Sequence, residues 1–233
     1  MSLPTLNVPT YNLTVPSTKQ RIKYRPFVVK EEKILLLALE SENDKEIADA
    51  LRNIVSACVT TKDFDFEKLA SFDIEYIFLN IRAKSVGEII ELFLTCPDDN
   101  ETEVKVNINV DDIKVKFDKA HSKTIQISDD LWVDLKYPGI DTFLGTQDNL
   151  DDTFTFIAKS IEKIYNEEDV WDDSTTTVDE FVSFLENMSS KQFNDVQNFF
   201  QTMPSLKHEV KIKNPNTKVE SSYTIEGLAN FFA

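Results

Sequence analysis

The residues that could carry out metal or nucleophilic chemistry are few and far apart. The chain of 233 residues has two cysteines, Cys58 and Cys96, and two histidines, His121 and His208. Neither histidine lies within a few residues of a cysteine or of the other histidine, so the spacing indicates no sequence-local metal site. A lone thiol without a nearby histidine is weak evidence for a nucleophile. We therefore expect free thiols, with Cys58 in the core, and histidines that each satisfy a local hydrogen bond.

Motifs for phosphate, acyl-transfer and calcium chemistry are missing as well. The four glycines are isolated and form neither GxGxxG nor GxxxxGK[ST], and no GxSxG occurs. Asp98, Asp99 and Asn100 resemble the start of a calcium loop, but the glycine at its sixth position and the glutamate at its twelfth are absent. We interpret these three as turn residues. We expect no enzyme activity, no cofactor and no metal.

Two predicted hairpins each have a turn that opens with an X-Pro pair. The first turn is Cys96-Pro97-Asp98-Asp99, and the second is Asn214-Pro215-Asn216-Thr217. In a zinc ribbon two such turns would each supply Cys-x-x-Cys to a tetrahedral thiolate site, and only one of the four thiols is present here. The two hairpins are therefore predicted to be knuckles that resemble a degenerate zinc ribbon.

Composition excludes several classes of protein. With 41% hydrophobic residues, 17 of them Phe, the chain has enough apolar material to fold. Its longest apolar run, from Ile34 to Leu39, is far shorter than the roughly 20 residues of a membrane span. The N-terminus lacks a signal-peptide pattern, so we expect a cytoplasmic protein. A net charge of −16 makes nucleic acid an unfavourable partner.

The charge is distributed unevenly along the chain. Residues 1–30 carry a charge of +5 with no acid, whereas residues 141–200 carry −11. Prolines at positions 4, 9, 16 and 26 favour extended conformations, which predicts an extended basic arm with short strands at 11–15 and 21–24. The arm could dock on its own chain or on a partner. The alternatives are two solvated faces of opposite sign, or a strand pair that folds on its own core.

Hydrophobic periodicity predicts an α+β fold with a mostly antiparallel sheet and two β-hairpin knuckles, flanked by two helical regions. Helices are expected from residue 30, at 44–59 and 71–84, then at 150–166, 177–187 and 189–202, with a short one at the C-terminus. Strands are expected at 88–95, 103–110, 113–117, 123–127, 131–137, 207–213 and 218–224. This gives a basic arm (1–30), a helical region (31–93), a β-rich region (94–140), an acidic helical region (141–205) and a C-terminal hairpin with a short helix (206–233). Residues 31–233 are expected to fold as one or two domains.

Aromatic residues gather in the last third of the chain. Phe193, Phe199, Phe200, Phe231 and Phe232 either pack in the protein's own core or anchor a partner. Together with the basic arm they give the candidate interface residues, which are Lys19, Arg21, Lys23, Arg25, Phe199, Phe200, Phe231 and Phe232.

Several runs of sequence resemble one protein family. They are RPFVVKEEK followed by ILLLALES (25–41), FDIEYIFLNIRAKSVGE (72–88), FFQTMPSLKHEV (199–210) and EGLANFF (226–232). Together they resemble the baseplate hub and hub-assembly proteins of T-even-like contractile-tailed bacteriophages. Relatives often carry Cys-Pro-x-Cys at both hairpins, so this member is expected to have lost the knuckle thiols.

The resemblance implies a structural or assembly role at the central hub of the baseplate, without catalysis. Its implied partners are other hub and tail-tube proteins, and its implied location is the host cytoplasm during assembly and then the virion tail baseplate. Two alternatives stay open: a transient chaperone of hub assembly that is absent from the mature virion, and a tail-associated cell-wall hydrolase.

Overall fold

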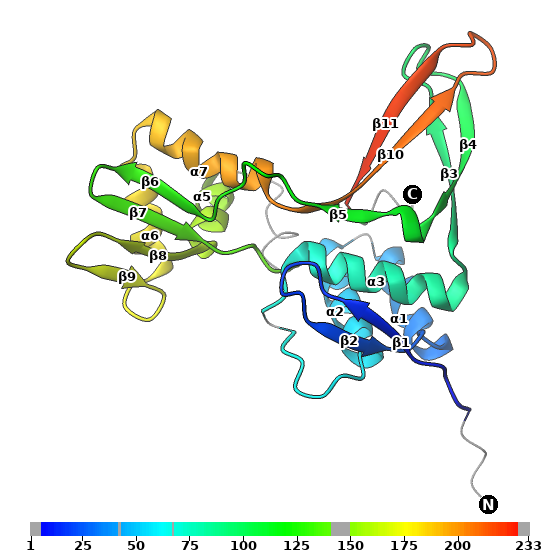
Figure 1. Cartoon of the computed structure of the whole chain (residues 1–233), viewed down its shortest axis with the longest axis horizontal. Helices are drawn as coiled ribbons and strands as arrows, with labels where there is room; N and C mark the ends of the chain where they lie inside the picture. The colour runs from blue at the N-terminus through cyan, green and yellow to red at the C-terminus, as the bar shows by residue number, and fades with distance from the viewer. Residues whose placement is uncertain (1–5, 42, 67, 141–149, 228–233) are drawn as a thin grey trace, which may run out of the picture. The chain divides into compact units, whose positions relative to one another are not determined.

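The computed structural model describes residues 6–41, 43–66, 68–140 and 150–227 and shows an α+β protein, with six α-helices and four small antiparallel sheets in these ranges. The chain forms two compact units (Figure 1). Unit 1 comprises Met1–Lys116 and Ser205–Ala233, and unit 2 comprises Phe117–Pro204. The predicted α+β class is confirmed. The prediction of one mostly antiparallel sheet is wrong, because the strands pair in four separate groups.

Unit 1 is built around a central helix. Its helices are α1 (Val29–Glu40), α2 (Asp44–Cys58) and α3 (Ser71–Val86), close to their predicted bounds. Nine residues of α3 are buried, as expected for a helix that is apolar on most sides. It ends at Gly87, whose φ of 136° is unfavourable for other residues. Cys58 at the end of α2 is fully buried, which confirms its predicted place in the core.

The N-terminal hairpin of unit 1 consists of β1 (Tyr11–Thr14) and β2 (Arg21–Tyr24). A second hairpin consists of β3 (Ile89–Thr95) and β4 (Glu103–Asn109), and a short 3₁₀ turn, Val110–Asp112, leads from it to β5 (Lys114–Lys116). The third consists of β10 (Ser205–Lys213) and β11 (Glu220–Glu226), with β5 paired to β10.

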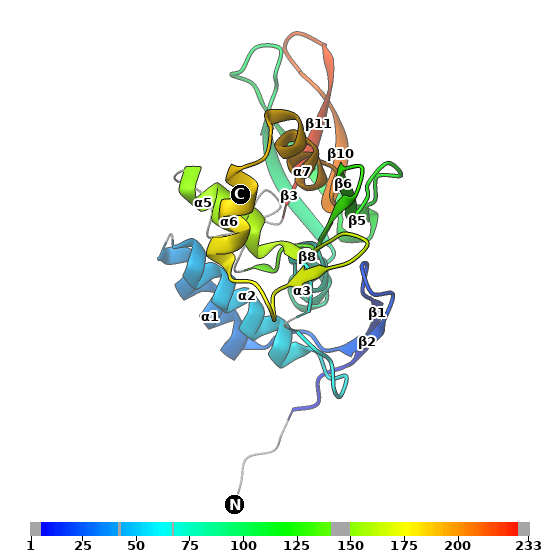
Figure 2. The same cartoon turned by 90° about the vertical axis from the view of Figure 1, so that its left-hand side faces the viewer.

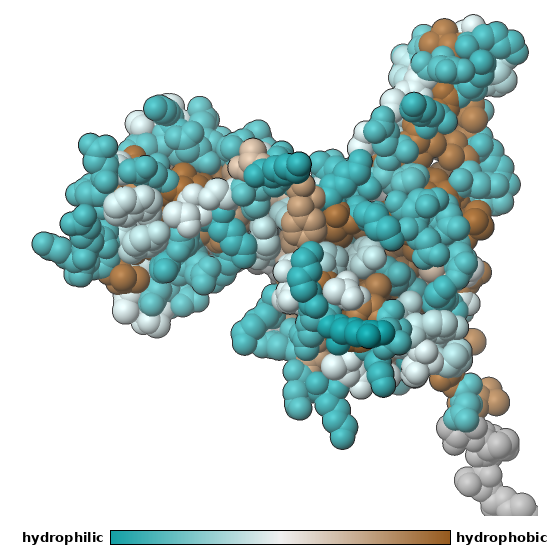
Figure 3. All heavy atoms as spheres, in the orientation of Figure 1, coloured by the Kyte–Doolittle hydropathy of each residue, from teal (hydrophilic) through white to brown (hydrophobic). Residues whose placement is uncertain are grey.

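The alternation of hydrophobic and polar residues along the strands decides which faces of the second and third hairpins are buried. Ile90, Leu92 and Leu94 of β3 are buried, as are Val210 and Ile212 of β10, while the residues between them are exposed. Hydrophobic side chains accordingly run along these hairpins between rows of hydrophilic ones (Figure 3). Both predicted hairpins are confirmed.

Unit 2 is a four-stranded antiparallel sheet with three helices on one face (Figure 2). The strand order is β6 (Thr124–Ser128), β7 (Leu131–Leu135), β8 (Ile161–Tyr165) and β9 (Val170–Asp172). The helices are α5 (Leu150–Lys159), α6 (Val178–Glu186) and α7 (Ser190–Thr202). Thr177 and Ser189 cap α6 and α7 through capping boxes, so these two predicted helices are confirmed.

The predicted helix at 150–166 is wrong beyond Lys159. Ile157, Ile161 and Ile164 have helical spacing, but residues 161–165 pair with β7 in the sheet. Ser160 marks the break: its hydroxyl donates to the carbonyl of Phe156, and its side chain is buried. Tertiary pairing therefore overrides a pattern that fits a longer helix. The predicted C-terminal helix lies outside the described residues.

Candidate interaction surfaces

The predicted basic arm is a folded part of unit 1 from Tyr11 onward. Val15, Ile22 and Tyr24 are at most 2% exposed, so their side chains belong to the core. The backbone of β2 is also bonded to the segment that follows α2, because the N–H of Thr60 donates to the carbonyl of Lys23 at 2.8 Å. For these residues the structure favours the alternative, a strand pair folded on its own core. Docking on a partner stays a prediction.

Two buried carboxylates attach this hairpin to the helices. Asp73 in the first turn of α3 is fully buried and accepts hydrogen bonds from the backbone N–H of Ser17, at 3.0 Å, and from its hydroxyl. Burial raises the pKa of Asp73, and the bonds from Ser17 offset this only in part. Glu31 of α1 accepts from Arg25 at 3.0 Å and from the N–H of Val28 at 2.9 Å. Burial would raise the pKa of Glu31, but these bonds outweigh it and lower the pKa.

The candidate cations of the hairpin differ in exposure. Lys19, Arg21 and Lys23 are exposed, and their role at an interface stays a prediction. Arg25 is half-buried and forms an ion pair with Glu31 inside the unit. This ion pair accounts for the side chain without a partner protein.

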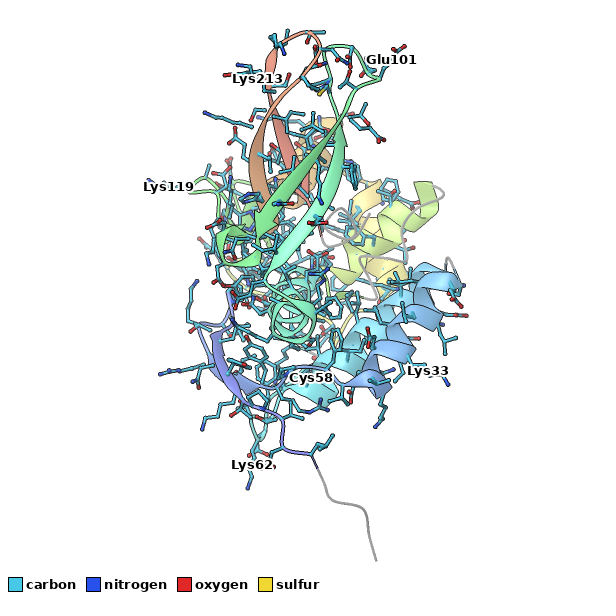
Figure 4. The ribbon with its side chains drawn as sticks, turned by 90° about the vertical axis from the view of Figure 1, so that its right-hand side faces the viewer. Lys33, Cys58, Lys62, Glu101, Lys119 and Lys213 are labelled. Atoms are coloured by element: carbon cyan, nitrogen blue, oxygen red, sulfur yellow. The ribbon has the colours of Figure 1, made fainter. Side chains whose placement is uncertain are left out.

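The tips of the second and third hairpins meet in a hydrogen-bonded group that we call the tip junction, consisting of Asp98, Asp99, Thr102, Asn214, Asn216 and Thr217. Figure 4 labels Glu101 and Lys213 beside it. The side-chain amide of Asn214 donates to both carboxylate oxygens of Asp98, at 3.2 and 3.1 Å, and to Asp99 at 2.8 Å. Its carbonyl oxygen accepts from the backbone N–H groups of Asn216 and Thr217. The hydroxyl of Thr217 donates to Asp98, and the amide of Asn216 donates to Thr102. Asn214 is 1% exposed, and its side chain makes five hydrogen bonds.

The tip junction therefore joins the positions that the sequence singled out. Asp99 stabilises its own turn, since its carboxylate accepts hydrogen bonds from the hydroxyl and the backbone N–H of Thr102. These bonds, together with the one from Asn214, lower the pKa of Asp99. The interpretation of Asp98, Asp99 and Asn100 as turn residues is confirmed, because residues 97–99 form a turn and the N–H of Asn100 donates back to the carbonyl of Cys96. Cys96 is buried beside them, and burial raises the pKa of its thiol. Among the residues that the structure describes, no group of three or more His, Cys, Asp or Glu side chains is placed to hold a metal ion.

The two tips share one backbone hydrogen bond, and a third turn has it as well. The N–H of Asn100 donates to the carbonyl of Cys96 at 2.9 Å, and Lys218 donates to Asn214 at 3.0 Å, each donor having a positive φ. In the N-terminal hairpin, Lys19 bonds to Val15 in the same way. All three turns contain an X-Pro pair, but the sequence pattern singled out only two of them.

The aromatic candidates in unit 2 form part of its core. The ring of Phe199 is 2% exposed and lies 4.9 Å from the ring of His121, 5.7 Å from Tyr137 and 5.0 Å from Phe200. The structure thus favours the core interpretation for Phe199, because a buried ring cannot anchor a partner. Phe200 is half-buried and its ring packs at a tilted angle against that of Phe156, again within unit 2. Phe231 and Phe232 lie outside the described residues.

The thiol of Cys58 and the ring of His121 also have structural surroundings. Burial raises the pKa of Cys58 to about 11, which keeps the thiol protonated. The Nδ1 atom of His121 is 3.0 Å from the hydroxyl of Thr202, which lies 81 positions away, so this hydrogen bond is not the local one that was expected. Burial lowers the pKa of this imidazole, with a smaller contribution from Lys123.

Two apolar surfaces were missed by sequence reasoning. One is a groove of about 380 Å³ in unit 2, lined by Leu131, Ile164, Trp171, Phe181 and Phe184 among others. The other is the exposed side of α1, where Val29, Leu36 and Leu37 are each more than half exposed. The run of six apolar residues from Ile34 to Leu39 is more than one buried helix face needs, so the sequence already indicated an exposed apolar side on this helix.

A comparison with models of protein families matches residues 8–233 to the family described as T4 bacteriophage base plate protein. The match covers nearly the whole chain, and the chain belongs to this family. It is therefore a bacteriophage baseplate protein, with a structural or assembly role and other baseplate proteins as partners. Comparison with curated proteins and with solved structures gives no match. In the described part of the chain, no helix is long and apolar enough to cross a membrane.

Proposed function

We propose that this protein acts at the central hub of the baseplate, as a structural or assembly component that works through protein–protein contacts. Membership of the baseplate family over residues 8–233 is the observation that carries the proposal. The runs of sequence that resemble hub proteins are the reason to place the protein at the hub rather than elsewhere in the baseplate. Hub and tail-tube proteins are the proposed partners, and the proposed location is the host cytoplasm followed by the virion tail.

The surfaces of the molecule support a binding role. Exposed apolar side chains occur on α1 and on β3, where Phe93 is 66% exposed, and contiguous apolar surface is typical of sites that meet another protein. The exposed cations Lys19, Arg21 and Lys23 give unit 1 a basic strip in a chain of net charge −16. Such a strip favours an acidic partner surface and guides encounter.

A cryo-EM map of intact baseplates, combined with mass spectrometry of purified particles, tests this function. We expect the chain to be traced at the hub and to be present in a fixed ratio to the other hub subunits. Its presence in assembling hubs but absence from purified particles would support the transient chaperone instead. A position at the baseplate periphery would contradict the hub assignment, and clearing of cell walls by the pure protein would support the hydrolase.

We also propose that the tip junction is a metal-free counterpart of a zinc ribbon. The four positions where thiolates would stand are Cys96, Asp99, Asn214 and Thr217. Hydrogen bonds connect the last three, because Asn214 donates to Asp99 directly and shares the acceptor Asp98 with Thr217. The backbone hydrogen bond that both turns share, from a donor with positive φ, supports this view. Hydrogen bonds then provide the connection between the hairpins that a metal would otherwise make.

The change Asn214→Asp tests this connection, because it replaces a donor to two carboxylates with a third carboxylate. We expect it to destabilise unit 1 by about 1–3 kcal/mol, since the remaining acids lose a buried donor and gain a like charge. The control Asn107→Asp adds the same charge at an exposed position of β4 outside the tip junction and should cost less. Elemental analysis should find no stoichiometric zinc, and a chelator should leave the melting temperature unchanged. One zinc per chain, or unfolding by the chelator, would refute the proposal.

A further inference from the structure

One side of α1 is exposed and largely apolar. Val29, Leu36 and Leu37 are 78%, 55% and 56% exposed, and the exposed residues Lys33 and Glu40 lie on the same side by helical spacing. We call these five residues the α1 face. The buried residues of the helix, Glu31 and Ala38, lie on the opposite side. Figure 4 shows Lys33 on the outer side of the helix.

An apolar stripe of this kind costs solubility unless something covers it. Flanking side chains extend it, because Ile34 and Leu39 are also more than one-third exposed. Contiguous exposed apolar surface is a usual mark of a site for another protein. The charges at its two ends indicate which protein fits.

The α1 face is complementary to itself. Its positive residue, Lys33, lies toward the N-terminal end of the helix, and its negative residue, Glu40, lies at the C-terminal end. When two copies of α1 lie antiparallel with a twofold axis between Leu36 and Leu37, each Leu36 faces the Leu37 of the other copy. The same operation places each Lys33 opposite a Glu40. One symmetric contact thus buries the leucines and makes two ion pairs.

We propose that the α1 face binds a second copy of this chain, and that the protein forms a twofold symmetric dimer through antiparallel α1 helices. The 12 residues of α1 span about 18 Å at 1.5 Å per residue, so the contact belongs to the small class below about 1,200 Å². We expect weak, reversible association, with a Kd in the micromolar range or above. The proposal concerns self-association and does not depend on a place at the hub.

Sedimentation equilibrium of the full chain at 0.15 M salt tests for the dimer. We expect a concentration-dependent mass that approaches twice 26.8 kDa. The double change Leu36→Glu with Leu37→Glu should abolish it, because two charges enter the apolar centre. Circular dichroism should be unchanged, since both leucines are more than half exposed. The matched control Phe93→Glu puts a charge on an equally exposed apolar residue outside α1 and should leave the dimer intact.

A charge exchange separates self-association from binding to some other helix. The single change Lys33→Glu turns both ion pairs into repulsive pairs and should weaken the dimer about tenfold, and Glu40→Lys should do the same. A mixture of the two variants should restore association, because the glutamate introduced at position 33 of one chain then faces the lysine introduced at position 40 of the other. The doubly exchanged chain should dimerise like the original.

Three results would overturn the proposal. One is a monomer at every concentration up to several hundred micromolar. Another is a dimer that survives the two leucine changes, which would place the contact elsewhere. The third is a mixture of the two charge variants that associates no better than either alone, which would exclude the antiparallel pairing.

Discussion

Deletion of residues 2–20 is expected to unfold unit 1 while unit 2 stays folded. The deletion removes β1 and the side chain of Val15, which is fully buried. It also removes Ser17 and so leaves the carboxylate of Asp73 buried without its two hydrogen bonds from this residue. Burial of one such apolar side chain is worth about 1.5–3 kcal/mol, and an unsatisfied buried polar group costs about 1–3 kcal/mol. Together with the lost strand pairing, this approaches the whole stability of a small domain.

The two units can be followed separately in this experiment. Both tryptophans, Trp132 and Trp171, lie in unit 2, so their fluorescence reports the unfolding of that unit alone. Far-UV circular dichroism should show the loss of α1, α2 and α3, while the fluorescence transition in urea stays in place. Deletion of residues 2–7 is the control, because Leu6 is 85% exposed, and it should leave both signals unchanged. A chain lacking residues 2–20 with native circular dichroism would restore the arm as a separate docking element.

The outcome at the N-terminus shows what a charge pattern can and cannot predict. Five cations and no acid indicate an arm that is exposed on one side, and Lys19, Arg21 and Lys23 are indeed exposed. The hydrophobic residues between them alternate with the cations, so the opposite side of the same strand is buried. The acids that hold the hairpin, Glu31 and Asp73, lie later in the sequence. Local composition therefore could not show that the arm is part of the core.

Helices with caps and hairpins with X-Pro turns were predictable because their signals are local. Thr177 and Ser189 begin their helices as expected, and Pro97 and Pro215 mark the two turns. The separation into two units was not visible, because β5 and β10 are 89 positions apart at their first paired residues, Lys116 and Ser205. The β-rich region predicted at 94–140 contributes strands to both units.

The tip junction was predictable only in part. The sequence indicated two similar turns with three of four thiols missing, but it gave no sign of what replaces them. The structure shows that Asn214 satisfies Asp98 and Asp99, which are more than 100 positions away. Asn, Asp and Thr side chains in turns usually bond to their own backbone. Here some of those bonds reach the other hairpin, and only the tertiary pairing of the two hairpins makes this possible.

The change Phe199→Ala is expected to destabilise unit 2 by about 3–5 kcal/mol, the usual cost of removing a buried phenylalanine ring. Phe199 contacts three rings, those of His121, Tyr137 and Phe200, and belongs to a core that also contains Val133 and Leu135. Removal of the ring would leave a cavity between α7 and the sheet. Tryptophan fluorescence in urea measures the effect, since both tryptophans lie in the same unit.

The same substitution also tests the interface interpretation against the core interpretation. If Phe199 anchors an interface, its truncation should cost at least about 2 kcal/mol of binding free energy and little folding stability. If Phe199 is a core residue, its truncation should lower folding stability first and should impair assembly only because less folded protein is present. Phe93→Ala is the control for stability, because this exposed ring should cost within about 0.5 kcal/mol. A Phe199→Ala protein with an unchanged urea transition that no longer enters baseplates would contradict the core interpretation, since a ring that is 2% exposed cannot be removed at no cost from a packed unit.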